Sequence, residues 1–186
     1  MCVESIRNKL LAHPIPVQIP IGAESNFAGV VDLIEMKAVL YHEEKTASSF
    51  AEGPIPDTLK ESAERWRHQM IETAAEYNDE LMNAYINDQP IKKEQIIAGL
   101  RKGTLIGKLN PVLIGAALKN IGVRRLLDAV TMYLPSPLDC PPAVGFKGGD
   151  KEKPVDVVCD NRKPFIGLAF KITSDKHGDL YFMRVY

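Results

Sequence analysis

A strand-to-helix segment at residues 111–122 contains the residue types best suited to hold a ligand through the backbone. A short apolar run at 112–114 leads into small residues at 115–117, and an amphipathic helix follows at 122–134. Small side chains let a ligand approach the backbone, so the N–H groups of Ala116, Ala117 and Leu118 are candidate donors to a carbonyl or an anion. In α/β domains, ligands bind outside the carboxyl ends of strands, and this segment directly follows the carboxyl end of the predicted strand. The residues alone leave open a plain strand-to-helix connection, which is the commoner case.

A second candidate is an acidic segment between Arg67 and Lys92, which contains no lysine or arginine. Glu72, Glu76 and Glu80 are four residues apart, so they share one face if a single helix continues through them. Like charges at this spacing destabilise a helix by about 0.2–0.5 kcal/mol per pair. An acidic face that is retained despite this loss of helix stability could attract a basic partner. The alternative is a solvated face that serves only solubility.

The sequence predicts no catalytic and no metal-binding residues. It lacks the GxxxxGK[ST] phosphate loop, the HExxH zinc motif and the GxSxG nucleophile motif. The histidines and cysteines are scattered and show no ligand or disulfide spacing; they are His13, His42, His68, His177, Cys2, Cys140 and Cys159. We therefore expect surface histidines and three reduced thiols, as in a cytoplasmic protein.

Composition is that of an ordinary globular protein. Of the 186 residues, 45% are hydrophobic and 25% are charged, with a formal net charge of −1. This balance gives no general attraction to nucleic acid or to an anionic membrane. No apolar run reaches the roughly 18 residues of a membrane span, and the first residues lack the basic start and apolar centre typical of a signal peptide. The chain starts within a helical pattern and ends within a strand pattern, which indicates an internal fragment of a longer protein.

The hydrophobic pattern predicts strands near both candidate sites. A helix at 2–12 should stop at the prolines of 13–16, and a strand should follow at 17–21. Residues 27–34 and 37–42 resemble a hairpin with its turn near Glu35, and 42–56 should be loop with at most a short strand. At the other end, 165–173 and 180–186 alternate with period two around 174–178, which predicts a second hairpin. Residues 143–163 should form short strands and loops.

Helices should dominate residues 57–105. One apolar stripe follows gaps of three or four through Leu59, Ala63, Trp66, Met70, Ala74, Tyr77 and Leu81. Asn78 and Asp79 favour helix caps, so this stripe could belong to two helices. A further helix at 91–105 should direct Ile96, Ile97 and Leu100 inward. The proline-rich stretch 135–142 is a stiff connection suited to joining two domains.

The amino-acid sequences of several segments resemble those of bacterial elongation factor G, a translational GTPase family. The resemblance rests on Gly-Ala-Ala-Leu-Lys-Asn-Ile-Gly-Val at 115–123, Leu-Asp-Ala-Val at 127–130 and Tyr-Leu-Pro-Ser-Pro at 133–137. Further matching segments lie at 16–22, 27–33, 101–104, 169–172 and 182–186, in the order of the family. The resemblance covers essentially the whole chain.

The resemblance implies an α/β fold that is the C-terminal part of a P-loop GTPase domain with an inserted α+β subdomain, followed by the start of an all-β barrel domain. Residues 1–21 and 106–137 would belong to the GTP-binding domain, 22–105 to the insertion, and 138–186 to the linker and incomplete barrel. The phosphate loop, the switch regions and the NKxD guanine-specificity motif would lie upstream of residue 1.

The same resemblance implies a cofactor and a partner. The full-length protein would bind GTP or GDP with Mg, and Ala116, Ala117 and Leu118 would form the last guanine-contacting motif. This motif usually begins with serine, so Ala116 lacks a supporting hydroxyl. Glu76 and Glu80 match positions thought to contact the C-terminal domain of the ribosomal stalk protein, and Glu72 could share their face.

The family resemblance implies GTP-driven movement of tRNA and mRNA through the ribosome by the full-length protein in the cytoplasm. Contacts with tRNA and rRNA would come mainly from domains outside this chain. The fragment itself should bind no nucleotide and hydrolyse no GTP, and no membrane contact is expected. Two alternatives remain open: a paralogous GTPase for ribosome recycling or mitochondrial translation, and a stand-alone acidic interaction module.

Overall fold

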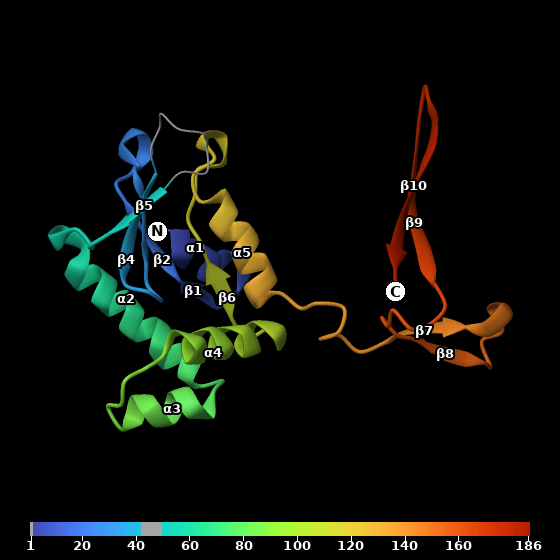
Figure 1. Cartoon of the computed structure of the whole chain (residues 1–186), viewed down its shortest axis with the longest axis horizontal. Coiled ribbons are helices and arrows are strands. Elements are labelled where there is room, and N and C mark those ends of the chain that lie inside the picture. The colour runs from blue at the N-terminus through green and yellow to red at the C-terminus, as the bar shows by residue number, and fades with distance from the viewer. Residues whose placement is uncertain (1, 42–49) are drawn as a thin grey trace. The chain divides into compact units, whose positions relative to one another are not determined.

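The computed structural model describes residues 2–41 and 50–186, which divide into two compact units (Figure 1). Unit 1 covers Met1–Leu134 and unit 2 covers Pro135–Tyr186. The fold is mixed α/β, with several small sheets rather than one large sheet. Both candidate sites lie in unit 1.

Unit 1 contains a pair of parallel strands that precede its candidate ligand turn. After helix α1 (Cys2–Leu10), strand β1 (Pro14–Pro16) pairs with β6 (Asn110–Val112). The helix ends before the prolines of 13–16, as predicted, but residues 14–16 also form a strand that the sequence did not predict. The strand tolerates two prolines because the groups bonded to β6 are on the alternate residues: the His13 carbonyl accepts from Asn110 N at 2.9 Å, and Val17 N donates to the Val112 carbonyl at 3.1 Å.

A four-stranded antiparallel sheet follows in the order β2-β3-β4-β5. Its strands are β2 (Gln18–Ile21), β3 (Gly29–Asp32), β4 (Lys37–Tyr41) and β5 (Phe50–Gly53). The predicted hairpin is confirmed, although its strands are shorter than expected. Asp32 closes the turn, because its Oδ1 accepts from the backbone N–H groups of Ile34 at 2.9 Å and Glu35 at 3.0 Å. The short strand allowed within 42–56 is β5; residues 42–49 lie outside the described residues.

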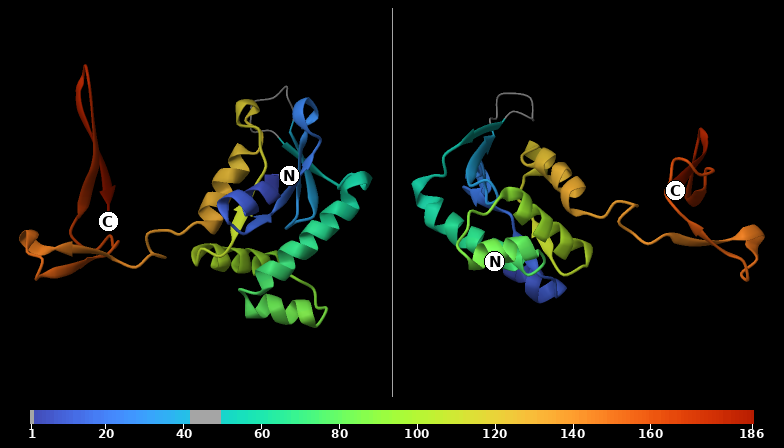
Figure 2. Two further views of the ribbon diagram at one scale, coloured as in Figure 1. Left: turned by 180° about the vertical axis from the view of Figure 1, so that it is seen from behind. Right: turned by 60° about the horizontal axis from the view of Figure 1, so that its bottom comes forward.

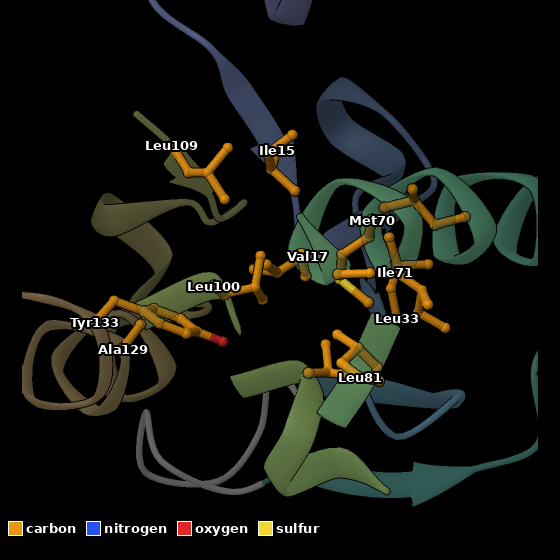
Figure 3. Close-up of a cluster of buried hydrophobic side chains, with 14 of the residues drawn as sticks. Ile15, Val17, Leu33, Met70, Ile71, Leu81, Leu100, Leu109, Ala129 and Tyr133 are labelled. Carbon is orange, nitrogen blue, oxygen red and sulfur yellow. The ribbon is translucent and has the colours of Figure 1, made fainter. Parts of the chain in front are cut away.

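The predicted apolar stripe lies on α2 (Asp57–Ala75) and α3 (Asp79–Ile86), which pack together with α4 (Lys93–Leu105) around one hydrophobic core. The break between α2 and α3 is confirmed, since the Asn78 side chain accepts from Leu81 N at 3.1 Å as an N-cap. Figure 3 shows the resulting core, in which side chains of β1, α2, α3, α4 and α5 (Val123–Tyr133) meet. Ile96 and Leu100 are fully buried and Ile97 is half-buried, as predicted. Arg67 on α2 donates to the carbonyls of Leu33 and Ile34 and so ties this helix to the hairpin turn.

Unit 2 contains two separate antiparallel pairs (Figure 2). Strands β7 (Ala143–Phe146) and β8 (Pro154–Val157) flank a short 3₁₀ turn, and β9 (Gly167–Asp175) pairs with β10 (Gly178–Val185). The predicted hairpin is confirmed, with a bulge between Phe182 and Met183. Its apolar side chains are exposed on both faces, including Phe170, Ile172 and Leu180.

Candidate functional site

The turn between β6 and α5 is held by backbone hydrogen bonds at its neck. Ala116 N donates to the Ile121 carbonyl at 3.0 Å, and Ile121 N donates to the Ala116 carbonyl at 3.1 Å. Between them lies a single 3₁₀ turn, Ala117–Lys119, which Asn120 ends in the left-handed conformation with φ 54°. Asparagine adopts this conformation more readily than most residues. The segment is therefore a closed loop with a defined shape.

Two glycines make the neck possible. A Cβ on Gly115 would lie 2.7 Å from the Ile121 carbonyl oxygen, and one on Gly122 would lie 2.8 Å from the Ile114 carbonyl oxygen. Gly122 also has φ +78°, which disfavours any side chain. The two strands of the neck can approach this closely only because both positions lack a Cβ.

The three predicted ligand-binding residues differ in what their backbone can offer. The N–H of Ala116 is already bonded to Ile121, whereas in the described part of the chain the N–H groups of Ala117 and Leu118 donate to no protein acceptor. Leu118 is fully exposed. Beside the loop is a hollow of about 170 Å³ lined by Ala117 and residues of the neck. The geometry thus offers two adjacent free donors, with Ala116 supporting the turn.

The acidic residues do not lie on one continuous helix. Helix α2 ends at Ala75, Glu76 is its C-cap, and Glu80 belongs to α3. The condition on which the shared face depended, an unbroken helix, is therefore not met, because Asn78 caps a new helix instead. Glu72, Glu76 and Glu80 are all exposed, and none forms an ion pair or side-chain hydrogen bond within the described residues. They remain a solvent-facing group spread over the α2–α3 junction.

A charged cluster that sequence reasoning missed joins α5 to the antiparallel sheet. Arg125 Nη1 donates to Asp32 Oδ2 at 2.8 Å, and Arg125 Nη2 donates to Glu52 Oε1 at 3.2 Å. The same guanidinium lies 5.4 Å from the ring centroid of Phe50. These contacts connect β3, β5 and α5. No motif could reveal them, because Arg125 and Asp32 are 93 residues apart in sequence.

This cluster lies close to the turn. Burial raises the pKa of the Tyr41 phenol, and the nearby Arg125 charge and Gly122 backbone N–H partly oppose that rise. Gly122 belongs to the neck of the turn, and Tyr41 belongs to β4 of the sheet. Tyr41 of the antiparallel sheet therefore lies near the neck of the candidate ligand turn.

Beneath the cluster is a cavity of about 310 Å³ between the sheet and α5. Two polar residues that are each only 4% exposed, Gln18 and Tyr133, line this cavity. Burial strongly raises the pKa of the Tyr133 phenol, and the negative charge of Asp32 raises it further. The phenol therefore stays protonated above its ordinary pKa of 10.0 and can act as a hydrogen-bond donor.

Other candidate groups remain dispersed. Among the residues described, no three histidine, cysteine or carboxylate side chains gather as a metal site would require. His68 pairs with the Tyr85 hydroxyl at 3.2 Å, and His42 lies outside the described residues. All three cysteines are free thiols, as predicted. In the part of the chain that the structure describes, no helix combines the length and apolar character needed to cross a membrane.

Fold comparison places this arrangement among known structures. The chain matches no protein-family model. Its mixed α/β architecture does recur in a solved structure of a longer protein. That protein is ttk003000868 from Thermus thermophilus, which is 21% identical and superposes with a TM-score of 0.71. The match covers 98% of this chain and 24% of the Thermus protein, so the chain spans about a quarter of that protein's length.

Proposed function

We propose that the chain is a segment of a translational GTPase of the elongation factor G type, in which the turn at 115–122 forms one edge of the guanine pocket. In this proposal, residues 1–21 and 106–137 complete the GTP-binding domain, 22–105 form its inserted subdomain, and 138–186 begin a β-barrel domain. The full-length protein would use GTP binding and hydrolysis to move tRNA and mRNA through the ribosome.

The observation that carries the proposal is the pair of free N–H groups at Ala117 and Leu118. A keto oxygen such as guanine O6 accepts hydrogen bonds, and the closed neck holds both donors in place before a ligand arrives. Small side chains at 115–117 allow a planar ring to approach the backbone. Because hydrolysis needs a phosphate cradle, magnesium and a positioned water, the 186 residues should turn over no GTP alone.

Proline substitution tests the donor pair. Ala117→Pro removes one N–H, and the extended backbone of Ala116, with φ −127° and ψ 94°, suits the residue before a proline. In the full-length GTPase that the proposal implies, we expect Ala117→Pro to weaken GDP affinity about tenfold, as measured by fluorescent nucleotide titration. Ala117→Ser keeps the N–H and should bind like the parent. Equal affinity in all three proteins would refute the guanine contact.

The acidic side chains provide the proposed docking surface for the ribosomal stalk protein. Glu72, Glu76 and Glu80 are exposed and have no ion-pair partners among the described residues, so their charge is available to a basic surface. We expect this chain to bind the purified stalk C-terminal domain, and Glu76→Lys with Glu80→Lys to abolish binding. The matched control reverses two exposed carboxylates elsewhere on α2, Glu61→Lys with Glu64→Lys. Binding unchanged by the first pair would exclude the acidic surface.

Assays on the full-length protein distinguish translocation from ribosome recycling. A translocation factor should advance mRNA on programmed ribosomes in a GTP-dependent manner, whereas a recycling paralogue should instead promote splitting of post-termination ribosomes. A protein with neither activity, but with stalk binding through Glu76 and Glu80, would favour a stand-alone interaction module.

A further inference from the structure

We propose that the cavity between the antiparallel sheet and α5 is a binding site for a small neutral molecule that carries a carbonyl acceptor, such as a carboxamide or a lactam. The cavity is separate from the two free N–H groups of the turn. The proposal therefore holds whether or not the turn contacts guanine.

Residues of β2, β3 and α5 supply most of the polar part of the cavity wall, and β5 and α4 contribute Phe50 and Ile97. Gln18 comes from β2, Asp32 from the end of β3, and Arg125, Ala129 and Tyr133 from α5. The last three are four residues apart and therefore lie along one face of the helix. The small side chain of Ala129, between two large ones, leaves space over the sheet. In Figure 3, the Tyr133 hydroxyl points away from α5 and toward the other labelled side chains.

The cavity contains polar atoms that lack protein partners. Gln18 Oε1 accepts from Ile114 N at 3.2 Å, but its amide nitrogen has no acceptor within the described ranges 2–41 and 50–186. The Tyr133 hydroxyl likewise has no partner there, and Arg125 Nε is buried without one. Gln18 and Tyr133 are each 96% buried, since each is 4% exposed. Among the described residues, Arg125 Nε is the one buried side-chain atom without a partner, whereas the Gln18 amide and the Tyr133 hydroxyl are open to the cavity. Polar groups in protein interiors are nearly always hydrogen-bonded, so these two open donors indicate a missing partner.

The groups without a partner are hydrogen-bond donors, whereas the Asp32 carboxylate, an acceptor in the cavity wall, already accepts hydrogen bonds from the protein. Asp32 Oδ1 accepts from the backbone N–H groups of Ile34 and Glu35, and Asp32 Oδ2 accepts from Arg125. An occupant must therefore supply acceptors to the Gln18 amide and the Tyr133 hydroxyl, because Arg125 Nε is too deeply buried for an occupant of the cavity to reach. A carbonyl oxygen with two lone pairs satisfies two such donors.

The charge of the lining residues and the volume of the cavity further restrict which molecules can bind there. Two arginines and three carboxylates line the cavity, which leaves one formal negative charge and disfavours an anion. An ammonium cation would present only donors to the Gln18 amide and the Tyr133 hydroxyl, which need acceptors. A volume of about 310 Å³ lies at the small end of ligand pockets. The remaining wall is mostly apolar, with Val17, Phe50, Leu113 and Met132, and suits an aromatic or alicyclic body.

Benzamide, benzoate and benzylamine test this chemistry because they share one ring and differ in the polar group. Each is titrated into the ¹⁵N-labelled chain and followed by two-dimensional NMR. We expect saturable shifts with benzamide that centre on residues 17–18, 32–35 and 125–133. Benzoate and benzylamine should bind at least about fivefold more weakly.

Two variants assign the donors. Tyr133→Phe removes one oxygen and should weaken benzamide binding about fivefold, the usual effect of one hydrogen bond. Tyr85→Phe, a matched change outside the cavity, should leave it unaltered. Gln18→Glu keeps the acceptor for Ile114 N but replaces the amide donor with a carboxylate oxygen. Benzamide should therefore bind more weakly, and benzylamine should bind more tightly. The Gln18→Glu result remains informative if Tyr133→Phe fails to fold.

The proposal fails if benzamide produces no saturable shifts at the cavity, which would leave water as its occupant. It also fails if benzoate or benzylamine binds as tightly as benzamide to the parent protein. Equal benzamide affinity in the parent, Tyr133→Phe and Gln18→Glu proteins would overturn it as well, because the named donors would then not contact the ligand.

Discussion

The ligand turn and the Arg125 cluster are adjacent in the fold but depend on different parts of the chain. The turn uses backbone atoms of eight consecutive residues, 115–122, and its shape requires only small side chains and two glycines. The cluster uses side chains of Asp32, Glu52 and Arg125 on three elements. A local backbone site can be fixed by a short segment of sequence, whereas a side-chain site depends on the whole tertiary arrangement. The following substitutions test that distinction.

The largest effect is expected at the neck of the turn. Gly122→Ala forces a left-handed residue and a 2.8 Å contact with the Ile114 carbonyl oxygen, and should destabilise unit 1 by about 3 kcal/mol. Gly107→Ala is the matched control, because Gly107 has φ +70° but an open surrounding, and it should cost about 1 kcal/mol. Urea unfolding followed by Trp66 fluorescence measures both changes. Equal losses would mean that the close backbone approach contributes nothing.

A smaller loss is expected in the Arg125 cluster. Arg125→Met removes the cation that pairs with Asp32 and leaves Glu52 only its exposed contact with Lys37, and should destabilise unit 1 by about 2 kcal/mol. The arginine side chain is 21% exposed, so the cost should stay below that of a fully buried pair. Arg124→Met, at the exposed neighbouring position, should change stability by less than about 0.5 kcal/mol. The same urea titration compares them, and similar losses would show that the ion pairs add no stability.

This distinction explains which features the sequence predicted. The β3–β4 hairpin, the break at Asn78 and the inward face of α4 depend on local periodicity or caps, and all three were predicted. Strand β1 was missed because prolines normally oppose strands, and only its pairing with β6 shows that their nitrogens face away from the partner. The turn was identified as a candidate, but the difference between the Ala116 and Ala117 donors depends on a bond to Ile121. The cavity could not be predicted, because Gln18 and Tyr133 converge only in the folded chain.

High pH provides a measure of how the cavity holds Tyr133. Burial and the Asp32 charge raise the folded-state pKa of this phenol above the ordinary value of 10.0, so the folded protein retains a proton that the unfolded chain loses. The contribution of the protonated Tyr133 phenol to the free energy of unfolding is complete below pH 10.0 and decreases as the pH rises further. Above pH 10.0, the free energy of unfolding should decrease by up to about 1.4 kcal/mol per pH unit through this group, and Tyr133→Phe should remove that decrease. Urea titrations at successive pH values measure the difference. Parallel curves for the parent and the variant would show that the phenol ionises freely.

The smallest effect is expected at the rim of the sheet, where Glu35 contacts Lys93 on α4 at 3.2 Å and Lys37 at 3.5 Å. The hydrogen bond from Lys93 holds the pKa of Glu35 below its usual value of 4.5, although partial burial opposes the shift. The stabilisation is therefore present above pH 4.5 and is lost as the pH falls through the lower folded-state value. The carboxylate is 37% exposed and screened by solvent, so Glu35→Gln should cost only about 0.3 kcal/mol at pH 7. The variant and parent should converge below about pH 4, whereas Glu94→Gln, with no ion pair among the described residues, should match the parent at both pH values. A Glu35→Gln loss above about 1 kcal/mol at pH 7 would mean that exposed side chains at this rim contribute as much as the buried cluster does.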